Sequence, residues 1–182
     1  MWDRLRITAE SPPAGDLPLA AVLVALYEDA AGDVRVVLTK RPDTMPTHAG
    51  HIAFPGGRPE VEDSGPVDTA LREAYEEVGI PAGDVELLGF LPAIHTFEFS
   101  LLVVPVVGRL PGTPELVPSE REVALVLEPR LTDLAEPERW RFELWNGNQV
   151  WFYDLDGEIL WGATARMMRQ LLGLDDDTAD RG

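Results

Sequence analysis

The sequence contains no cysteine among its 182 residues, which excludes disulfide bonds, thiolate metal sites and a cysteine nucleophile. It also has almost no lysine, because Lys40 is the single lysine among 15 basic residues and the others are arginine. Long hydrophobic runs are lacking as well, and the longest, near residues 17–27, is too short to span a bilayer. These absences fit a protein of the cytoplasm, and we expect that location.

Basic residues are scarce relative to acidic ones, with 15 against 32 and a formal net charge of -17. Such a charge repels nucleic acids and anionic membranes over most of the surface, so we expect neither as a partner. A phosphate-bearing small molecule remains compatible with it where basic groups or a metal ion gather locally. The composition leaves the oligomeric state undecided, and a homodimer is an open alternative.

Length and composition indicate one domain, because the chain is 45% apolar, carries no internal repeat and is long enough to bury a core. We expect the domain to span residues 17–173. Residues 1–16 would form an N-terminal arm, and residues 174–182 an acidic, disordered tail.

Apolar runs and turn residues predict strands mixed with a few helices. Runs of Val, Leu and Ala at 19–28 and 34–40 read as a hairpin, and Asn146-Gly147-Asn148 indicates a second hairpin between 141–145 and 149–154. Further strands are expected at 85–90 and 101–107, and helices at 66–78 and 162–172. Pro66 is a plausible first residue and Gly79 a plausible stop for the first helix. The pattern predicts an α/β fold with a mixed sheet between helices.

The first helix carries three glutamates on one side. At about 100° of rotation per residue, Glu73, Glu76 and Glu77 fall within an arc of about 100°. Each like-charged pair costs about 0.2–0.5 kcal/mol, and a hard divalent cation such as Mg²⁺, which prefers oxygen ligands, would turn this repulsion into binding. The alternative is an ordinary solvated face on which Arg72 pairs with Glu76.

The surrounding sequence favours the metal. Gly56-Gly57, followed after a loop by Arg72-Glu73-Ala74-Tyr75-Glu76-Glu77-Val78-Gly79-Ile80, resembles the Nudix box. The second half matches closely, whereas the first half departs from the pattern. Arg58 stands where the box has a glycine and Ser64 where it has a glutamate, with Glu62 and Asp63 as the nearest substitutes.

The resemblance implies a Nudix fold and a pyrophosphate hydrolase that uses Mg²⁺ or Mn²⁺. It implies that Glu73 and Glu77 are the main metal ligands, with Glu76 as a further ligand or as the residue that helps to activate water. Arg72 would orient these carboxylates by ion pairing. The backbone carbonyl of Gly57 would add a ligand, because glycine allows the close approach of backbone to metal and phosphate.

Upstream residues resemble the coenzyme A pyrophosphatase branch of this family. Leu38, Thr39, Arg41, Gly50 and Phe54-Pro55-Gly56-Gly57 match its signature, whereas Pro42 and Pro46 replace a serine and an arginine. The branch implies cleavage of coenzyme A into 3′,5′-ADP and 4′-phosphopantetheine. The residues expected to bind substrate are Lys40, Arg41, His48, Gly50, Phe54, Gly56 and Arg58. For Lys40 and Arg58, a basic strand end that only balances neighbouring acids is the alternative.

Several assignments stay open. Glu98 and Glu122 are candidate general bases, although each fits an ordinary surface acid better. The tryptophans at 140, 145, 151 and 161 fit a core or an interface, or a stack against adenine. Rival substrates are ADP-ribose, NADH and nucleoside triphosphates. A non-catalytic nucleotide sensor is a further alternative, which the intact set of box glutamates disfavours.

Overall fold

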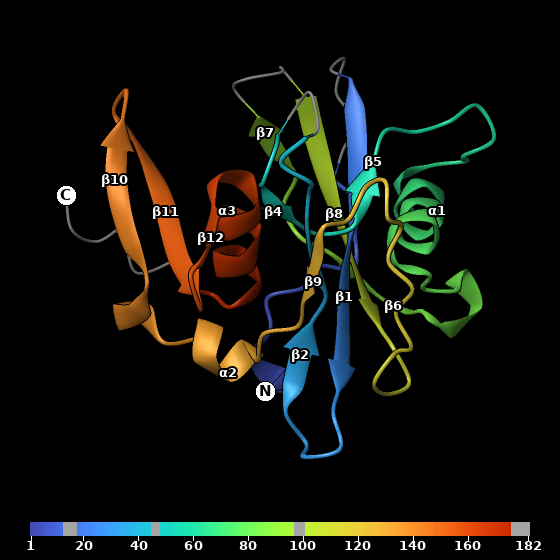
Figure 1. Cartoon of the computed structure of the whole chain (residues 1–182), viewed down its shortest axis with the longest axis horizontal. Helices are drawn as coiled ribbons and strands as arrows, with labels where there is room; N and C mark the ends of the chain where they lie inside the picture. The colour runs from blue at the N-terminus through green and yellow to red at the C-terminus, as the bar shows by residue number, and fades with distance from the viewer. Residues whose placement is uncertain (13–17, 45–47, 97–100, 176–182) are drawn as a thin grey trace.

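The computed structural model describes residues 1–12, 18–44, 48–96 and 101–175. Its centre is a 6-stranded mixed sheet in which β2-β1-β8-β6 lie side by side, while β5 pairs with β1 and β7 with β8 (Figure 1). The strands of this sheet are β1 (Leu19–Glu28), β2 (Val34–Val36), β5 (Gly56–Gly57), β6 (Glu86–Phe90), β7 (Ile94–Thr96) and β8 (Leu101–Arg109). β1 and β8 run parallel, and the other pairs in the sheet are antiparallel.

The apolar run of β1 is buried on both faces because each face meets a different core. Alternate residues such as Leu23 and Ala25 pack with Ala70 and Ala74 of α1 (Pro66–Val78). The intervening residues, including Leu26, belong to the second core, which also holds side chains of α3 (Gly162–Leu171). Figure 1 shows α1 and α3 on opposite sides of β1 and β8. The predicted fold, a mixed sheet between helices, is confirmed.

Local signals placed the two long helices correctly. α1 begins at Pro66 and ends before Gly79, which adopts a left-handed conformation with φ 76° and donates its N–H to Tyr75 O at 2.9 Å. α3 begins at Gly162, as expected, and ends at Leu171. Glycine suits position 79 because a side chain resists positive φ.

The prediction of one strand over residues 34–40 is wrong. β2 pairs with β1, but β3 (Leu38–Lys40) belongs to a separate 3-stranded sheet of order β4-β3-β9, with β4 (Ile52–Ala53) and β9 (Leu125–Leu127). The chain changes sheets at Val37, whose side chain is fully buried and whose N–H still bonds to Ala25 O. Continuous burial of apolar residues hides such a break from the sequence pattern.

The second predicted hairpin forms part of a C-terminal sheet of order β10-β11-β12. β10 (Arg141–Trp145) and β11 (Asn148–Leu155) flank Asn146 and Gly147, whose φ values of 51° and 81° match a type I′ turn. β12 (Glu158–Trp161) leads directly into α3. The short helix α2 (Leu131–Leu134) and the 3₁₀ turns Trp2–Arg4, Ala82–Asp84 and Pro137–Arg139 complete the fold.

Residues of the expected N-terminal arm lie against the domain. Thr8 exchanges backbone hydrogen bonds with Phe90, and Arg6 N–H donates to Leu171 O at 2.9 Å. The expected acidic tail lies outside the described residues from position 176 onward. Within the described ranges, none of the helices is long and apolar enough to cross a membrane.

The left-handed end of α1 is testable. We expect Gly79→Ala to lower the free energy of unfolding by about 1–2 kcal/mol, because a non-glycine residue resists this φ, and because its Cβ would meet Val117 Cβ at 3.2 Å. Gly83→Ala is the matched control, since a Cβ there meets open space. Urea denaturation measures both, and an equal loss in the two variants would contradict this account.

Candidate active site

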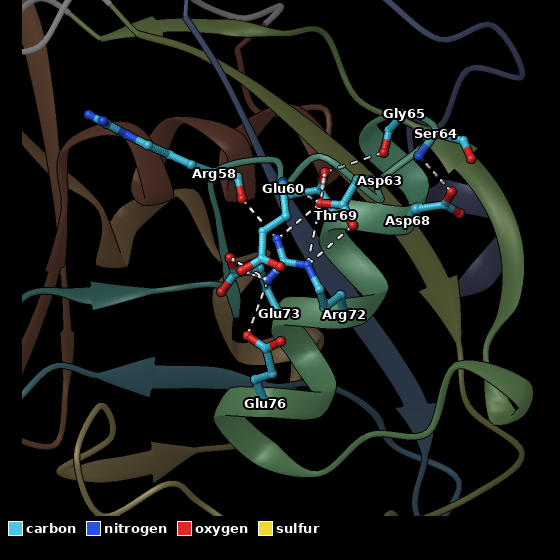
Figure 2. Close-up of polar contacts among 10 residues, drawn as sticks. All are labelled: Arg58, Glu60, Asp63, Ser64, Gly65, Asp68, Thr69, Arg72, Glu73 and Glu76. Carbon is cyan, nitrogen blue, oxygen red and sulfur yellow. Dashed lines mark hydrogen bonds and ion pairs between the residues drawn. The ribbon is translucent and has the colours of Figure 1, made fainter.

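Arg72 is the centre of the polar contacts on α1 (Figure 2). Its Nη1 lies 3.1 Å from Glu73 Oε1 and 3.1 Å from Glu76 Oε2. Its Nη2 lies 3.0 Å from Asp63 Oδ2 and donates to the carbonyl oxygen of Arg58 at 2.9 Å. One guanidinium therefore holds three carboxylates and the loop after the Gly-Gly turn in a single network.

In the first half of the box, where the sequence departs from the family pattern, Asp63 rather than Glu62 pairs with Arg72. Its carboxylate receives Arg72 Nε and Nη2, Thr69 Oγ1 at 2.9 Å and the backbone N–H of Glu60 at 2.8 Å. Hydrogen bonds from Arg72, followed by the one from Glu60 N–H, lower the pKa of Asp63 to about 2. The hydrogen bond from Thr69 to Asp63 was not predicted from the sequence, although Thr69 lies one helical turn before Glu73.

Glu77 is buried, with 6% of its surface exposed, so the solvated-face alternative does not hold for it. Burial, and then the negative charges of Glu73 and Glu122, raise the pKa of Glu77 to about 8. The backbone N–H of Gly56 and the charge of Arg41 oppose this rise. Glu77 is thus a desolvated carboxyl group whose negative charge is incompletely compensated by the protein.

The Gly-Gly turn lies directly between β1 and the carboxylates. Gly56 and Gly57 pair with Val22 and Ala21 of β1, and a Cβ on Gly56 would collide with the backbone of that strand. A Cβ on Gly57 would collide with the carboxylate of Glu73. Burial raises the pKa of Glu73, while Arg72 counteracts it. Glycine is required at position 56, because a Cβ there would meet the backbone of β1, whereas at position 57 a Cβ would only displace the carboxylate end of Glu73.

The structure brings Glu122, one of the two candidate general bases, to the same acidic group. Its negative charge acts on Glu73 and Glu77. The loop that carries it is tied to α1 by Ser119 N–H, which donates to Glu77 O at 2.8 Å, and by Val117 N–H, which donates to Val78 O. β9, which follows this loop, was not predicted.

Glu98, the other candidate base, lies outside the described residues, as does Pro46.

Arg41 follows β3 and reaches the acidic group, where its charge lowers the pKa of Glu77. Its Nε is buried and has no hydrogen-bond partner within the described part of the chain. Lys40, in contrast, is paired with Glu158 of β12, and its Nζ lies 2.8 Å from Glu158 Oε2. This ion pair agrees with the alternative that Lys40 balances a neighbouring acid.

The remaining residues expected to bind substrate lie in different surroundings. Gly50 has φ 69° and bonds to Arg41 O, and the exposed His48 packs its ring on His51. Phe54 has 2% of its surface exposed and lies in the core, so a substrate would reach it only if the core opened. Figure 2 shows the Arg58 side chain pointing away from the α1 carboxylates, and its backbone carbonyl instead meets Arg72.

Two of the three box glutamates are held by Arg72, and in the described ranges no three acidic or histidine side chains converge as a ready-made metal site. The donor set nevertheless suits a hard cation, because it offers carboxylate oxygens beside a glycine turn and leaves the charge of Glu77 incompletely balanced. The residues expected to hold Mg²⁺ or Mn²⁺ therefore fit that role in chemical type, and Glu73 and Glu76 would have to turn away from Arg72 to fill it.

Comparison with known proteins identifies the class to which this fold and site belong. The family described as NUDIX domain matches residues 17–151. The chain is 35% identical over 156 residues to "Uncharacterized Nudix hydrolase NudL" of Citrobacter koseri, covering 84% of this chain and 80% of that protein. The chain therefore belongs to the Nudix family. Membership supports hydrolysis of a pyrophosphate bond in a nucleotide-like substrate, and Nudix hydrolases generally use divalent cations, commonly Mg²⁺ or Mn²⁺.

Further relatives agree in fold or sequence. "Nudix hydrolase 22, chloroplastic" of Arabidopsis thaliana is 38% identical over 159 residues, covering 82% of this chain, but the match spans only 52% of the plant protein. A MutT/nudix family protein from Enterococcus faecalis has a TM-score of 0.61 at 18% identity, covering 94% of this chain and 67% of that one. RenU, a Nudix hydrolase from M. smegmatis, has a TM-score of 0.54 at 22% identity, with coverages of 64% and 73%.

The ion pair between Asp63 and Arg72 predicts a defined acid dependence of stability. The folded-state pKa of Asp63, about 2, lies below its ordinary value of 3.8, so the pair stabilises the fold above the ordinary value. This contribution is lost as the pH falls toward about 2. We expect Asp63→Asn to lower the Tm near neutral pH, and the difference from the unmodified protein to shrink steadily below about pH 4.

Asp68→Asn is the matched control, because the Asp68 carboxylate accepts a hydrogen bond from Ser64 N–H instead. Thermal unfolding followed by circular dichroism at several pH values measures all three proteins. A Tm difference for Asp63→Asn that stayed constant down to about pH 2 would show that the carboxylate charge does not matter.

Proposed function

We propose that this protein hydrolyses the pyrophosphate bond of coenzyme A, with Mg²⁺ or Mn²⁺, to 3′,5′-ADP and 4′-phosphopantetheine. The observation that carries the hydrolytic part is the buried, incompletely compensated carboxyl group of Glu77 beside Glu73 and the Gly56-Gly57 turn. Burying a carboxyl group whose charge the protein compensates only in part is costly, so its position favours a positively charged ligand. The coenzyme A part rests on the residues before the turn.

The carboxylates of Glu73, Glu76 and Glu77, with the carbonyl of Gly57, are the proposed ligands of the metal. When bound, a divalent cation neutralises developing negative charge and lowers the pKa of a bound water. Glu76 has 49% of its side chain exposed, so it can rotate at little cost. Glu73 is more enclosed and already rests against Gly57.

Asp63 allows this rearrangement. If Glu73 and Glu76 turn from Arg72 toward a cation, the guanidinium still keeps the two-point contact with Asp63 and the bond to Arg58 O. The positive charge is therefore never left unpaired, and the backbone loop stays in place. Arg72 and Asp63 act as positioning residues in this proposal.

Glu122 is the proposed general base. It is exposed, it lies close enough to act electrostatically on Glu73 and Glu77, and its loop is anchored to α1. Water attacks one phosphorus, the bridging P–O bond breaks, and the water oxygen remains on that product phosphate. The proton of the water passes to Glu122, while Glu76 remains the alternative acceptor.

Arg41 is the proposed phosphate contact. Its buried Nε has no hydrogen-bond partner among the described residues, and a small shift of the guanidinium toward a phosphate oxygen would satisfy it while its charge balances the pyrophosphate. Arg41 also belongs to the segment that resembles the coenzyme A branch, which supports coenzyme A over other pyrophosphates. Lys40 is excluded from the proposed contacts because Glu158 already engages it.

Removing the buried carboxylate tests the metal proposal. We expect Glu77→Gln to lower kcat with coenzyme A and Mg²⁺ by more than about 100-fold, the upper end of the loss typical for groups that merely support a metal ligand. Glu62→Gln is the matched control, because Glu62 is exposed and Asp63 is the residue that engages Arg72. Chromatographic measurement of 3′,5′-ADP, run beside ADP-ribose, NADH and nucleoside triphosphates, provides the readout.

The substrate panel separates the two parts of the proposal. Faster cleavage of another substrate than of coenzyme A would overturn the assignment to the coenzyme A branch, but the assignment as a pyrophosphatase would stand. An absence of cleavage at any concentration of Mg²⁺ or Mn²⁺ would overturn both and favour a nucleotide sensor.

The phosphate contact has its own test. We expect Arg41→Ala to lower kcat/KM about tenfold to a hundredfold, mainly through KM, since a hydrogen bond to a charged group contributes about 1.5–3 kcal/mol. The control is Arg139→Ala, whose guanidinium lies over the ring of Tyr153. Steady-state kinetics with coenzyme A measure both variants, and unchanged kinetics in Arg41→Ala would refute the contact.

A further inference from the structure

One face of the C-terminal sheet carries a continuous group of aromatic rings, which we name the aromatic face: Trp145, Phe152 and Trp161. The register places Arg141, Phe152 and Trp161 opposite one another on this face. The Trp145 ring centroid lies 5.6 Å from that of Trp161 and 5.8 Å from that of Phe152. Trp161 and Phe152 are nearly parallel, with 11° between their planes. The three rings come from three different strands.

This face differs from the opposite face of the same sheet. The opposite face holds Tyr153 and Leu160, which are buried in the core, and Trp151, whose ring lies under the guanidinium of Arg169 in α3. On the aromatic face, Trp145 keeps 45% of its surface exposed despite two ring contacts. A large aromatic ring that is held in place yet open to solvent is suited to stacking against a planar ligand.

The aromatic face is physically continuous with the proposed phosphate contact. The His51 ring centroid lies 4.7 Å from that of Trp161. The backbone of His51 accepts a hydrogen bond from Arg41 N–H at 3.0 Å, and the charge of Arg41 acts on Glu77. Two successive ring contacts therefore connect the segment beside the metal ligands to Trp145. A nucleotide whose phosphates meet Arg41 would extend its base along this line.

Polar contacts help to hold the rings of the aromatic face in place. The Arg141 guanidinium lies 4.8 Å from the centroid of the Phe152 ring, and its side chain is 62% exposed. Arg141 pairs with Glu143 at 3.2 Å, an exposed and therefore weak kind of pair that leaves no net charge between the two residues. Glu143 also accepts a hydrogen bond from Trp145 Nε1 at 2.9 Å, which fixes the orientation of the indole.

We propose that the aromatic face binds the adenine base of the substrate, with Trp145 as the stacking residue. The proposal rests on the function proposed above for the choice of adenine nucleotide. It adds a recognition element that lies on the C-terminal sheet rather than in the box or the segment before it. Trp145 would act on binding and specificity, and the hydrolytic residues on α1 would remain unaffected.

The test compares two faces of one strand. Trp145→Ala and the milder Trp145→Leu, which keeps an apolar side chain against Phe152, remove the stacking ring. Phe142→Ala is the matched control, because Phe142 lies on the opposite face of β10 with a similar exposure of 49%. Isothermal titration calorimetry with adenosine 3′,5′-bisphosphate in EDTA measures binding without metal or turnover. We expect both Trp145 variants to raise the Kd about fivefold to tenfold, and Phe142→Ala to leave it unchanged.

Ribose 5-phosphate serves as the ligand without a base. The expected loss in the Trp145 variants is confined to the adenine ligand, with matching far-ultraviolet circular dichroism showing that the sheet is intact. An equal Kd for the unmodified protein and Trp145→Leu, or an equal loss in Phe142→Ala, would overturn the aromatic subsite. Neither of these results would bear on whether the protein hydrolyses coenzyme A. Conversely, the loss of hydrolysis in Glu77→Gln would not affect the conclusion about stacking on Trp145.

Discussion

The contact between Arg72 and Asp63 is the interaction on which the arrangement of the acidic site depends. One guanidinium joins the loop after the Gly-Gly turn to the helix, and it holds two of the box glutamates at the same time. A carboxylate at this position has to be firmly ionised, and the low pKa of Asp63 shows that the surrounding donors ensure it. Of the two residues nearest to the position of the box glutamate, Asp63 is the one that reaches Arg72 from this loop.

β1 imposes the second constraint. Because this strand separates two cores, its path is fixed on both faces, and the Gly56-Gly57 turn is fixed by pairing with it. The helix that carries the glutamates packs on the same strand. The carboxylates of α1 and the Gly-Gly turn, which come from two different parts of the chain, are thus located by a common support, and this gives the proposed metal ligands a preorganised position.

Features set by local chemistry were predictable from the sequence, and features set by long-range contacts were not. Pro66 and Gly79 marked both ends of α1, and Asn146-Gly147 marked a hairpin turn, since each depends on backbone preferences of one or two residues. The break at Val37 was invisible because burial on both sides erases the alternation of apolar and polar residues. The approach of Glu122 to Glu77, and the pairing of Lys40 with Glu158, depend on contacts between distant parts of the chain that no local pattern encodes.

The ion pair between Lys40 and Glu158 has a consequence for the order in which the protein is assembled. Glu158 lies 118 positions after Lys40, and the ring contact between His51 and Trp161 spans a comparable stretch of chain. Proteins leave the ribosome at about 5–20 residues per second, so the strand that supports the segment around Arg41 emerges several seconds after it. The helix with the glutamates can pack on β1 in that interval, whereas the segment around Arg41 gains its contacts with β12 only when that strand arrives. A nascent chain would therefore position the proposed metal ligands before the proposed phosphate contact has its full support.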